Sequence, residues 1–210
     1  YIRKDWNSLN ILSQQASSVG AIDLDFHSIN EKENFSFFDK LKNNEFKLLY
    51  LLGVDDINFN KDEKFIVYQG SHGDKGAEMA DIILPGAAYT EKNGLFVNLE
   101  GKLQNAYKAS YPPGESREDW IIFKDLANTM KKPLNFNNIK NLRENINKQI
   151  KEKISKKTEN KNSVDFVDDT ISVRPIDYYY TNPIARSSKV MSECRKISKS
   201  FLFTGIEKAS

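Results

Sequence analysis

Three short apolar runs, each followed at once by glycine or proline, constrain the fold of this chain most strongly. They span residues 47–52, 64–69 and 81–84 and are stopped by Gly53, Gly70 and Pro85. Continuous apolar runs of this length, bounded by residues that break regular structure, are typical of buried strands in a parallel sheet. Because connecting segments separate the runs, the pattern predicts an α/β domain with a mainly parallel sheet.

Apolar residues at three- and four-residue spacing predict helices around these strands. The expected helices cover residues 6–19, 117–130, 139–154 and about 183–200, and the run at 95–98 could add a fourth strand. Asp5 and Ser116 are the expected N-caps of the first two helices, and Gly20 is the expected stop of the first. We expect three parts: an α/β segment at 1–134, a polar helix and mobile linker at 135–163, and a C-terminal docking tail at 164–210.

The charge balance and the residue inventory exclude several classes of protein and site. The chain has 31 basic and 29 acidic residues, so its net charge of +2 gives no reason to expect a nucleic-acid partner. Cys194 is the single cysteine, which excludes a disulfide within the chain and an iron–sulfur cluster held by its own cysteines. Two histidines are too few for a histidine-rich metal cage, and no stretch approaches the roughly 20 apolar residues that span a bilayer.

The stretch from Gly70 to Gly76 directly follows an expected strand and is the most unusual in the sequence. Its three glycines, at positions 70, 73 and 76, resemble a loop that cradles phosphate groups. The spacing fits neither the dinucleotide-binding fingerprint nor the P-loop, and such loops are also routine tight turns, so the structural interpretation is favoured. His72 beside Asp74 suggests a general base, but no Ser or Cys nucleophile accompanies it in a recognisable motif, and a hydrogen-bonding or surface histidine is favoured.

Three further groups admit both a functional and a structural interpretation. Glu91 and Glu100 could form a pair of catalytic carboxylates, but each adjoins a glycine turn whose amides an acid commonly binds. Cys194 precedes Arg195, a cation that could activate a thiol, although an unpartnered cysteine is usually inert. The aromatic run Tyr178–Tyr180 could dock on another subunit or pack on its own domain, and the sequence favours neither.

Two adjoining motifs resemble a known family. Residues 68–77 are Tyr-Gln-Gly-Ser-His-Gly-Asp-Lys-Gly-Ala, and residues 80–92 are Ala-Asp-Ile-Ile-Leu-Pro-Gly-Ala-Ala-Tyr-Thr-Glu-Lys. Continued by Val-Asn-Leu-Glu-Gly-Lys at 97–102, this string closely resembles the largest iron–sulfur subunit of respiratory complex I, NADH:ubiquinone oxidoreductase. The resemblance resumes at 112–114, 117–120, 177–180 and 182–188, and it extends from about residue 6 to 195.

This resemblance implies the molybdopterin-oxidoreductase fold, here as a partial α/β domain with an extended or helical C-terminal tail. It also implies a structural, cofactor-free part of the matrix-facing arm of complex I, at the mitochondrial inner membrane, that supports electron transfer from NADH to ubiquinone. The family's cluster-binding cysteines lie in an N-terminal part that has no counterpart here. The iron–sulfur clusters are therefore expected on that N-terminal part. Either the gene is split and a partner chain carries them, or this chain is a fragment. Other matrix-arm subunits are the further expected partners. No residue receives a catalytic, cofactor-binding or metal-binding role, and the chain itself is not expected to be catalytic.

Two other interpretations remain open. One is a fragment of a molybdopterin-dependent oxidoreductase that retains a nucleotide cofactor at Gly70–Gly76 and Asp81, and the other is a free-standing nucleotide-binding module. Under the structural interpretation, an incomplete domain leaves apolar faces uncovered, so we expect the isolated chain to be poorly soluble or unstable. The Tyr- and Pro-containing segment 177–186 is then expected to lie as an arm on a neighbouring chain.

Overall fold

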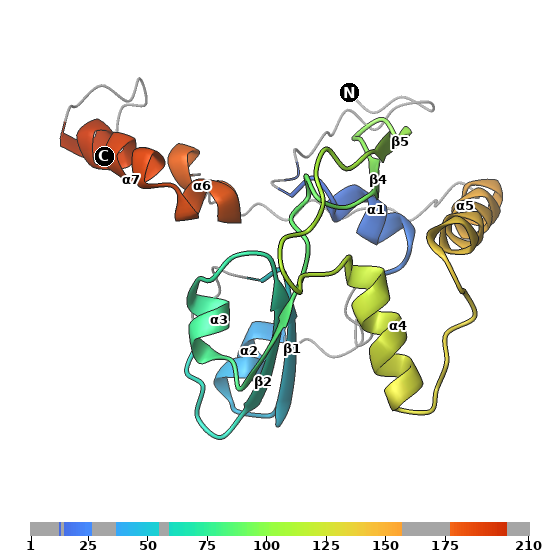
Figure 1. Ribbon diagram of the computed structural model, residues 1–210, viewed down its shortest axis with the longest axis horizontal. Helices are drawn as coiled ribbons and strands as arrows, with labels where there is room; N and C mark the ends of the chain where they lie inside the picture. Colours follow the sequence, from blue (N-terminus) through green and yellow to red (C-terminus); the bar gives the residue numbers. More distant parts are fainter. Residues whose placement is uncertain (1–12, 14, 27–36, 55–58, 157–176, 201–210) are drawn as a thin grey trace, which may run out of the picture. The chain divides into compact units, whose positions relative to one another are not determined.

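The computed structural model describes residues 13, 15–26, 37–54, 59–156 and 177–200 (Figure 1). The chain divides into two compact units. The first comprises Tyr1–Asp39 and Tyr89–Lys161, and the second comprises Lys40–Ala88 and Asn162–Ser210. The sequence-based boundaries at residues 134 and 163 stay a prediction.

A three-stranded parallel sheet forms the centre of the second unit. Its strands, in the order β1–β2–β3, are Leu48–Leu52, Phe65–Gly70 and Ile82–Pro85. The register places Leu49 beside Ile66 and Tyr68 beside Ile83. The α/β class and the parallel pairing of the three apolar runs are confirmed.

The core of the second unit lies on one face of this sheet. Two helices contribute to it, α2 at Phe37–Lys42 and α3 at Lys75–Met79. Leu41 of α2 and Met79 of α3 pack against Ile66 and Tyr68 of the central strand, which are 0% and 2% exposed. Both helices therefore cover the same face of the sheet.

The opposite face of the sheet is only partly covered: Gln69 on this face is fully buried, but several apolar side chains are exposed. Leu48, Leu52, Phe65 and Ile82 keep 60%, 43%, 46% and 45% of their surface exposed. In β1 and β2 they alternate with the core residues, as the pleat of a strand requires. The expectation that β3 is a buried strand is wrong, because β3 lies at the edge of the sheet and its Ile83 is also 54% exposed.

The described residues of the first unit form an antiparallel hairpin and three helices. The strands are β4 at Gly94–Val97 and β5 at Leu103–Ala106, and the helices are α1 at Ser18–Asp23, α4 at Asp119–Thr129 and α5 at Ile139–Lys156. The expected fourth strand exists, but it belongs to this separate sheet. Asn98 closes the hairpin, since its Oδ1 accepts the N–H groups of Glu100 and Lys102 at 3.0 and 2.8 Å. Gly101 completes the turn with a φ of +80°, which favours glycine.

The helix expected at 6–19 is wrong at Ser13 and residues 15–17, and only its last two residues belong to α1. Ser13 and residues 15–17 are not helical, and α1 begins at Ser18 and continues through Gly20, the expected stop. Gly20 instead permits a close approach to the hairpin, because a Cβ there would lie 3.5 Å from Val97. Residues 1–12, including the expected cap Asp5, lie outside the described residues.

Two other helix ends differ from expectation. Helix α4 is preceded by Glu118 as its N-cap, because Ser116 instead donates its hydroxyl to the carbonyl of Pro113 at 2.8 Å. Helix α5 continues to Lys156, two residues beyond its expected end. The rest of the expected linker, residues 157–163, lies outside the described residues.

The C-terminal helical segment, residues 177–200, consists of three short elements. They are η1 at Tyr178–Tyr180, α6 at Pro183–Ser187 and α7 at Lys189–Ser200. The single helix expected at 183–200 is thus interrupted at Ser188, whose backbone is extended. Its hydroxyl oxygen accepts the N–H of Met191 at 3.3 Å, so Ser188 starts a second helix rather than continuing the first.

The loop from β2 to α3 is packed tightly around the ring of Tyr68. A Cβ at Gly70 would lie 2.1 Å from the Tyr68 hydroxyl, and a Cβ at Gly76 would lie 2.4 Å from the carbonyl oxygen of Val54. The Tyr68 hydroxyl donates to the carbonyl of His72 at 2.8 Å, which holds the buried ring in place. Glycine is therefore required at these two positions by close packing.

Asp81 ties the start of β3 to the central strand. Its N–H donates to the carbonyl of Ile66 at 2.8 Å, and its Oδ2 accepts the N–H of Ile66, also at 2.8 Å. Its Oδ1 lies 2.6 Å from Lys61 Nζ. The hydrogen bond from Lys61, followed by that from the Ile66 amide, lowers the pKa of Asp81 below its ordinary value of 3.8.

The glycine packing predicts that Gly76→Ala lowers the free energy of unfolding of the full chain by about 1–3 kcal/mol, because the new methyl group meets the Val54 backbone. Gly73→Ala is the matched control: nothing lies within 4 Å of its Cβ position, and we expect a change within about 0.5 kcal/mol. Urea denaturation followed by circular dichroism measures both. Equal losses for the two variants would contradict this account of the loop.

The lowered pKa of Asp81 predicts a pH-dependent effect of Asp81→Asn. A carboxyl whose pKa is lower in the folded state stabilises the fold fully above its ordinary pKa of 3.8 and loses that contribution as the pH falls through the lowered value. The variant should therefore unfold at a lower urea concentration than the wild type at pH 7, and the gap should close below about pH 4. A gap that stays constant down to about pH 3 would show that the charge of Asp81 is not responsible.

Candidate functional site

The candidate site is the glycine-rich loop, defined as residues 70–76, at the carboxyl end of the central strand β2. Ligands of open α/β sheets bind beyond the carboxyl ends of the strands, so this is the position at which a functional loop is expected. The loop begins with Gly70, the last residue of β2, and ends in the first turn of α3. The N-cap residue of α3 is Asp74, whose Oδ1 accepts the N–H of Lys75 at 2.9 Å.

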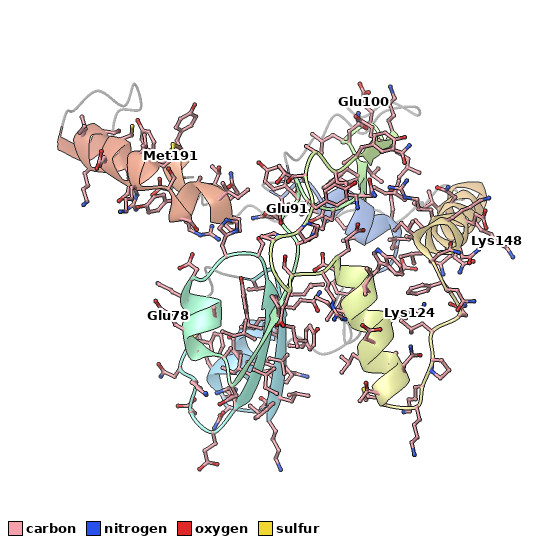
Figure 2. All side chains as sticks on the ribbon, in the orientation of Figure 1. Glu78, Glu91, Glu100, Lys124, Lys148 and Met191 are labelled. Atoms are coloured by element: carbon pink, nitrogen blue, oxygen red, sulfur yellow. The ribbon has the colours of Figure 1, made fainter. Side chains whose placement is uncertain are left out.

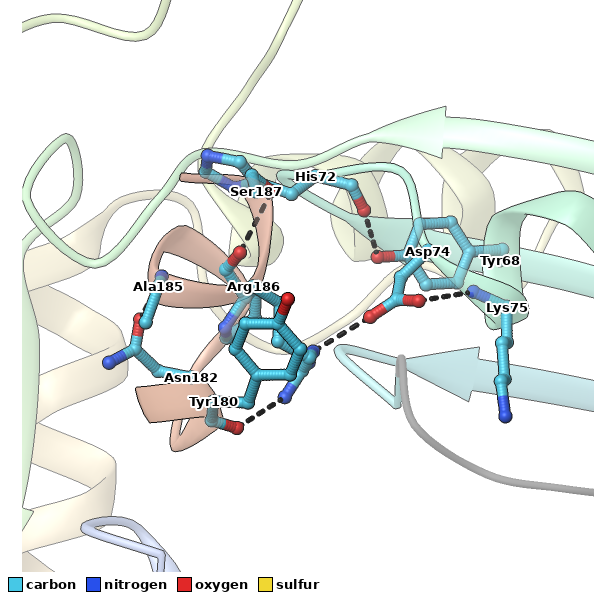
Figure 3. A network of polar contacts seen from close by, with 10 residues as sticks. Tyr68, His72, Asp74, Lys75, Tyr180, Asn182, Ala185, Arg186 and Ser187 are labelled. Atoms are coloured by element: carbon cyan, nitrogen blue, oxygen red, sulfur yellow. Dashed lines mark hydrogen bonds and ion pairs between the residues drawn. The ribbon is translucent and has the colours of Figure 1, made fainter. Parts of the chain in front are cut away.

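The structure does not bring His72 and Asp74 together as a general-base pair. The Nδ1 of His72 lies 2.9 Å from the hydroxyl of Ser71, and the carbonyl of His72 accepts the Tyr68 hydroxyl. Asp74 is directed elsewhere: its second oxygen, Oδ2, accepts Nε–H of Arg186 at 2.7 Å. Figure 3 shows Asp74 between Lys75 and Arg186, with the Tyr68 hydroxyl pointing at His72.

The residues of the loop do not fit a phosphate cradle. The Cβ positions of Gly70 and Gly76 point at the chain's own Tyr68 and Val54, so these glycines do not open space for a ligand. Asp74 adds a carboxylate, which repels a phosphate, at the polar edge of the loop. Asp81 binds Lys61 and Ile66 with its two oxygens, as described above. These groups are arranged to hold segments of the chain together.

The structure separates the two carboxylates at Glu91 and Glu100. Figure 2 places Glu100 at the tip of the β4–β5 hairpin and Glu91 near its base. Glu100 is exposed at the turn that Asn98 closes, and Glu91 lies in the connection before β4. The arrangement does not provide the paired carboxylates of general acid–base chemistry.

Cys194 and the tyrosine run occupy the C-terminal helical segment. Cys194 is half-buried on α7 as a free thiol, while the neighbouring Arg195 is directed to Asp177, with 2.5 Å between Nε and Oδ2. The Arg195 guanidinium also lies 4.4 Å from the ring centroid of Tyr180, and Tyr178 is 80% exposed. The tyrosine run therefore contributes both to its own segment and to the surface.

A network of ion pairs in the first unit was not predicted from the sequence. Lys92 pairs with Asp119, and Lys108 Nζ lies 3.4 Å from Glu118 Oε1. The indole N–H of Trp120 donates to the other oxygen of Glu118 at 3.0 Å. Lys92 ends the motif at 80–92, and Glu118 and Asp119 belong to the motif at 117–120. The motifs thus contain these paired residues, but no spacing rule predicts that the residues pair. The network fixes the start of α4.

Neither a candidate metal-binding cluster nor a membrane-spanning helix is found among the described residues. No cluster of three or more His, Cys, Asp or Glu side chains in these ranges could hold a metal ion. Within the same ranges, no helix has both the length and the apolar character needed to cross a membrane.

Two regions of the chain match known protein families. Residues 1–129 match the molybdopterin oxidoreductase family. Residues 144–194 match a second family, the C-terminal region of the G-type subunit of NADH-ubiquinone oxidoreductase. The glycine-rich loop lies in the first match and Arg186 in the second.

Individual relatives agree with these matches. The chain is 40% identical over 208 residues to the NADH-ubiquinone oxidoreductase 75 kDa subunit of Reclinomonas americana, covering 93% of this chain and 29% of the relative. It is 41% identical over 201 residues to the G-type subunit of NADH-quinone oxidoreductase from Rickettsia conorii, covering 92% and 28%. It is 37% identical over 210 residues to the mitochondrial 78 kDa subunit of Candida albicans, covering 90% and 28%. The chain thus spans less than a third of these relatives, and it belongs to the molybdopterin oxidoreductase family, in the group formed by the G-type, or 75–78 kDa, subunits of NADH-quinone oxidoreductase.

Proposed function

We propose that this chain is a structural, cofactor-free part of the largest iron–sulfur subunit in the peripheral, matrix-facing arm of respiratory complex I, at the mitochondrial inner membrane. The observation that carries the proposal is the glycine-rich loop, in which Gly70 and Gly76 are packed by Tyr68 and Val54 and the carboxylate of Asp74 is bound by Arg186. In a cofactor-binding loop, these backbone and side-chain groups would be turned toward the ligand.

Partners supply the redox chemistry in this proposal. An iron–sulfur cluster needs several cysteine thiolates, and Cys194 is the single cysteine of the chain. The clusters that carry electrons from NADH to ubiquinone therefore lie on the N-terminal iron–sulfur part of the subunit, whether on the same or on a separate polypeptide, and on other subunits of the arm. The names of the relatives, which are subunits of NADH-ubiquinone and NADH-quinone oxidoreductases, support this assignment.

The exposed apolar side chains on the second face of the parallel sheet support a scaffold that is completed by a partner. Leu48, Leu52, Phe65 and Ile82 form an apolar surface that a parallel sheet normally buries under helices. The relatives are more than three times as long as the region matched here, so the whole subunit has ample chain to provide such a cover. Burying this surface gives the assembly a hydrophobic driving force without any catalytic group in this chain.

The competing function is a molybdopterin-dependent oxidoreductase that retains a nucleotide cofactor at Gly70–Gly76 and Asp81. Membership of the molybdopterin oxidoreductase family favours it, as does the position of the loop at the carboxyl end of β2. The packing of the loop and the contacts of both Asp81 oxygens weigh against it. A fold alone does not imply a function, so the loop chemistry decides our choice.

Elemental analysis of the purified assembly separates these functions. We expect molybdenum and tungsten far below one atom per chain and no released pterin, because the loop groups are occupied by the protein itself. Iron measured in the same digest is the internal control, since it reports the clusters of the partner subunits. Molybdenum or tungsten at one atom per chain, lost in an Asp81→Asn assembly that retains its iron, would favour the oxidoreductase.

Deletion of residues 177–210 tests the assembly role. The C-terminal helical segment exposes Tyr178, Val190 and Ile197 at 80%, 65% and 56%, a surface suited to a neighbouring chain. The deletion should lower incorporation into the arm several-fold while the cluster signals per assembled complex, measured by electron paramagnetic resonance, stay unchanged. Removing only residues 201–210 is the control. Loss of one particular cluster signal from fully assembled complex would place this chain next to the electron path and contradict the proposal.

A further inference from the structure

The polar edge of the glycine-rich loop is formed by Asp74, and its two oxygens have different partners. Oδ1 accepts the N–H of Lys75 and so caps α3 at 2.9 Å. Oδ2 accepts Nε–H of Arg186 at 2.7 Å, across 112 positions of sequence. One carboxylate thus shapes the loop and at the same time binds the C-terminal helical segment.

The ion pair between Asp74 and Arg186 is partly shielded from water. The side chains keep 27% and 16% of their surface exposed, whereas the pair between Arg117 and Asp125 keeps 60% and 52%. Exposed pairs contribute little to stability because water and salt screen them. A charge-assisted hydrogen bond that is partly removed from solvent is stronger, so the contact of Arg186 with the loop is the one expected to matter.

Contacts within its own segment also position Arg186. Helix α6 starts with Asn182, whose Oδ1 accepts the N–H of Ala185 at 2.9 Å, and with Pro183 in its first turn. Nη1 of Arg186 also donates to the carbonyl of Tyr180 at 3.5 Å, as Figure 3 shows. The guanidinium is therefore braced by its own segment, which lowers the entropy lost when it binds Asp74.

A second ion pair joins the remaining elements of the segment. Asp177 accepts Nε–H of Arg195 from α7 and the N–H of Tyr179 from η1. Arg195 also lies over the ring of Tyr180, at 4.4 Å from its centroid. These contacts link η1 to α7.

We propose that the glycine-rich loop is the docking site of the chain's own C-terminal helical segment, with Arg186 as the group that it binds. Asp74 lies in the region that matches the molybdopterin oxidoreductase family, and Arg186 lies in the region that matches the second, C-terminal family. The ion pair is then the joint between these two regions. This inference deepens the proposed structural function and rests on it, because the loop of a scaffold is free to bind a segment of protein.

Because of this ion pair, the C-terminal helical segment is bound to its own chain and is not only an arm that lies on a neighbouring chain. One side of the segment is bound to the loop through Arg186, while Tyr178 and Val190 are exposed. Docking in this manner presents the exposed side chains in a fixed orientation. A partner that binds them meets a preorganised surface, which reduces the entropy cost of assembly.

Hydrogen exchange on the purified assembly that contains the full chain tests this joint. Asp74→Asn keeps the helix cap, since an asparagine oxygen also accepts the N–H of Lys75, but it removes the charge that binds Arg186. Arg186→Gln removes the other partner. Each variant should speed amide exchange about tenfold in both residues 71–76 and residues 177–187, because each side of a coupled pair protects the other. Arg117→Gln, which breaks the exposed pair with Asp125, is the matched control and should change neither segment more than about twofold.

The double variant Asp74→Asn, Arg186→Gln gives the decisive comparison. If the two residues act through one contact, the double variant exchanges no faster than either single variant. Effects that multiply, or a change confined to the mutated segment, would overturn the joint. The same measurements on the isolated full chain apply where a variant does not assemble. The two tests are independent. Molybdenum at one atom per chain would overturn the proposed function, whereas the exchange data alone decide whether Asp74 and Arg186 join the two regions.

Discussion

The ring of Tyr68 sets the path of the chain from β2 into α3. It is buried in the core of the sheet, it donates its hydroxyl to the carbonyl of His72, and it occupies the space beside Gly70 and Gly76. A side chain at either glycine would have to displace the ring or the Val54 backbone. The position of Asp74 at the start of α3 follows from this path, and so does the approach of Arg186.

The charged groups of the second unit follow one pattern. Asp74 and Asp81 each accept a backbone N–H with one oxygen and bind a cation with the other. The backbone contact of Asp74 caps α3 and that of Asp81 ties β3 to the central strand, and in both cases the cation brings in a residue from elsewhere in the chain. Carboxylates used in this way are satisfied, so burying them partly costs little and they have no need of an external ligand. The sheet is thus held to its loops by the same motif residues that suggested a binding site.

Much of the second unit could be predicted because local rules decide it. The runs ended by Gly53, Gly70 and Pro85 became the parallel strands, since apolar runs of that length have few alternatives. The exposure of β3 could not be predicted in the same way. An apolar run shows that a strand can be buried, whereas its position at the edge of the described sheet depends on strand order. Ser188 ends α6 and caps α7, and the periodicity of apolar residues alone does not detect this interruption.

The glycine spacing located the candidate loop at residues 70–76. It did not predict the chemistry of the loop, because the partner of Asp74 lies 112 positions away and no periodicity connects the two. Long-range ion pairs depend on how finished elements pack, so an acid in a motif identifies a candidate without identifying what it binds.

A glycine motif can persist for reasons that have nothing to do with a ligand. If Gly70 and Gly76 served only to admit a phosphate, their Cβ positions would face open space, as that of Gly73 does. They face Tyr68 and Val54 instead, so the packing of the sheet by itself requires glycine at both positions. The presence of glycine at these two positions therefore reports the fold and is not by itself evidence of a bound cofactor. That information has to come from groups other than these two glycines, such as the charged side chains of Asp74 and Arg186.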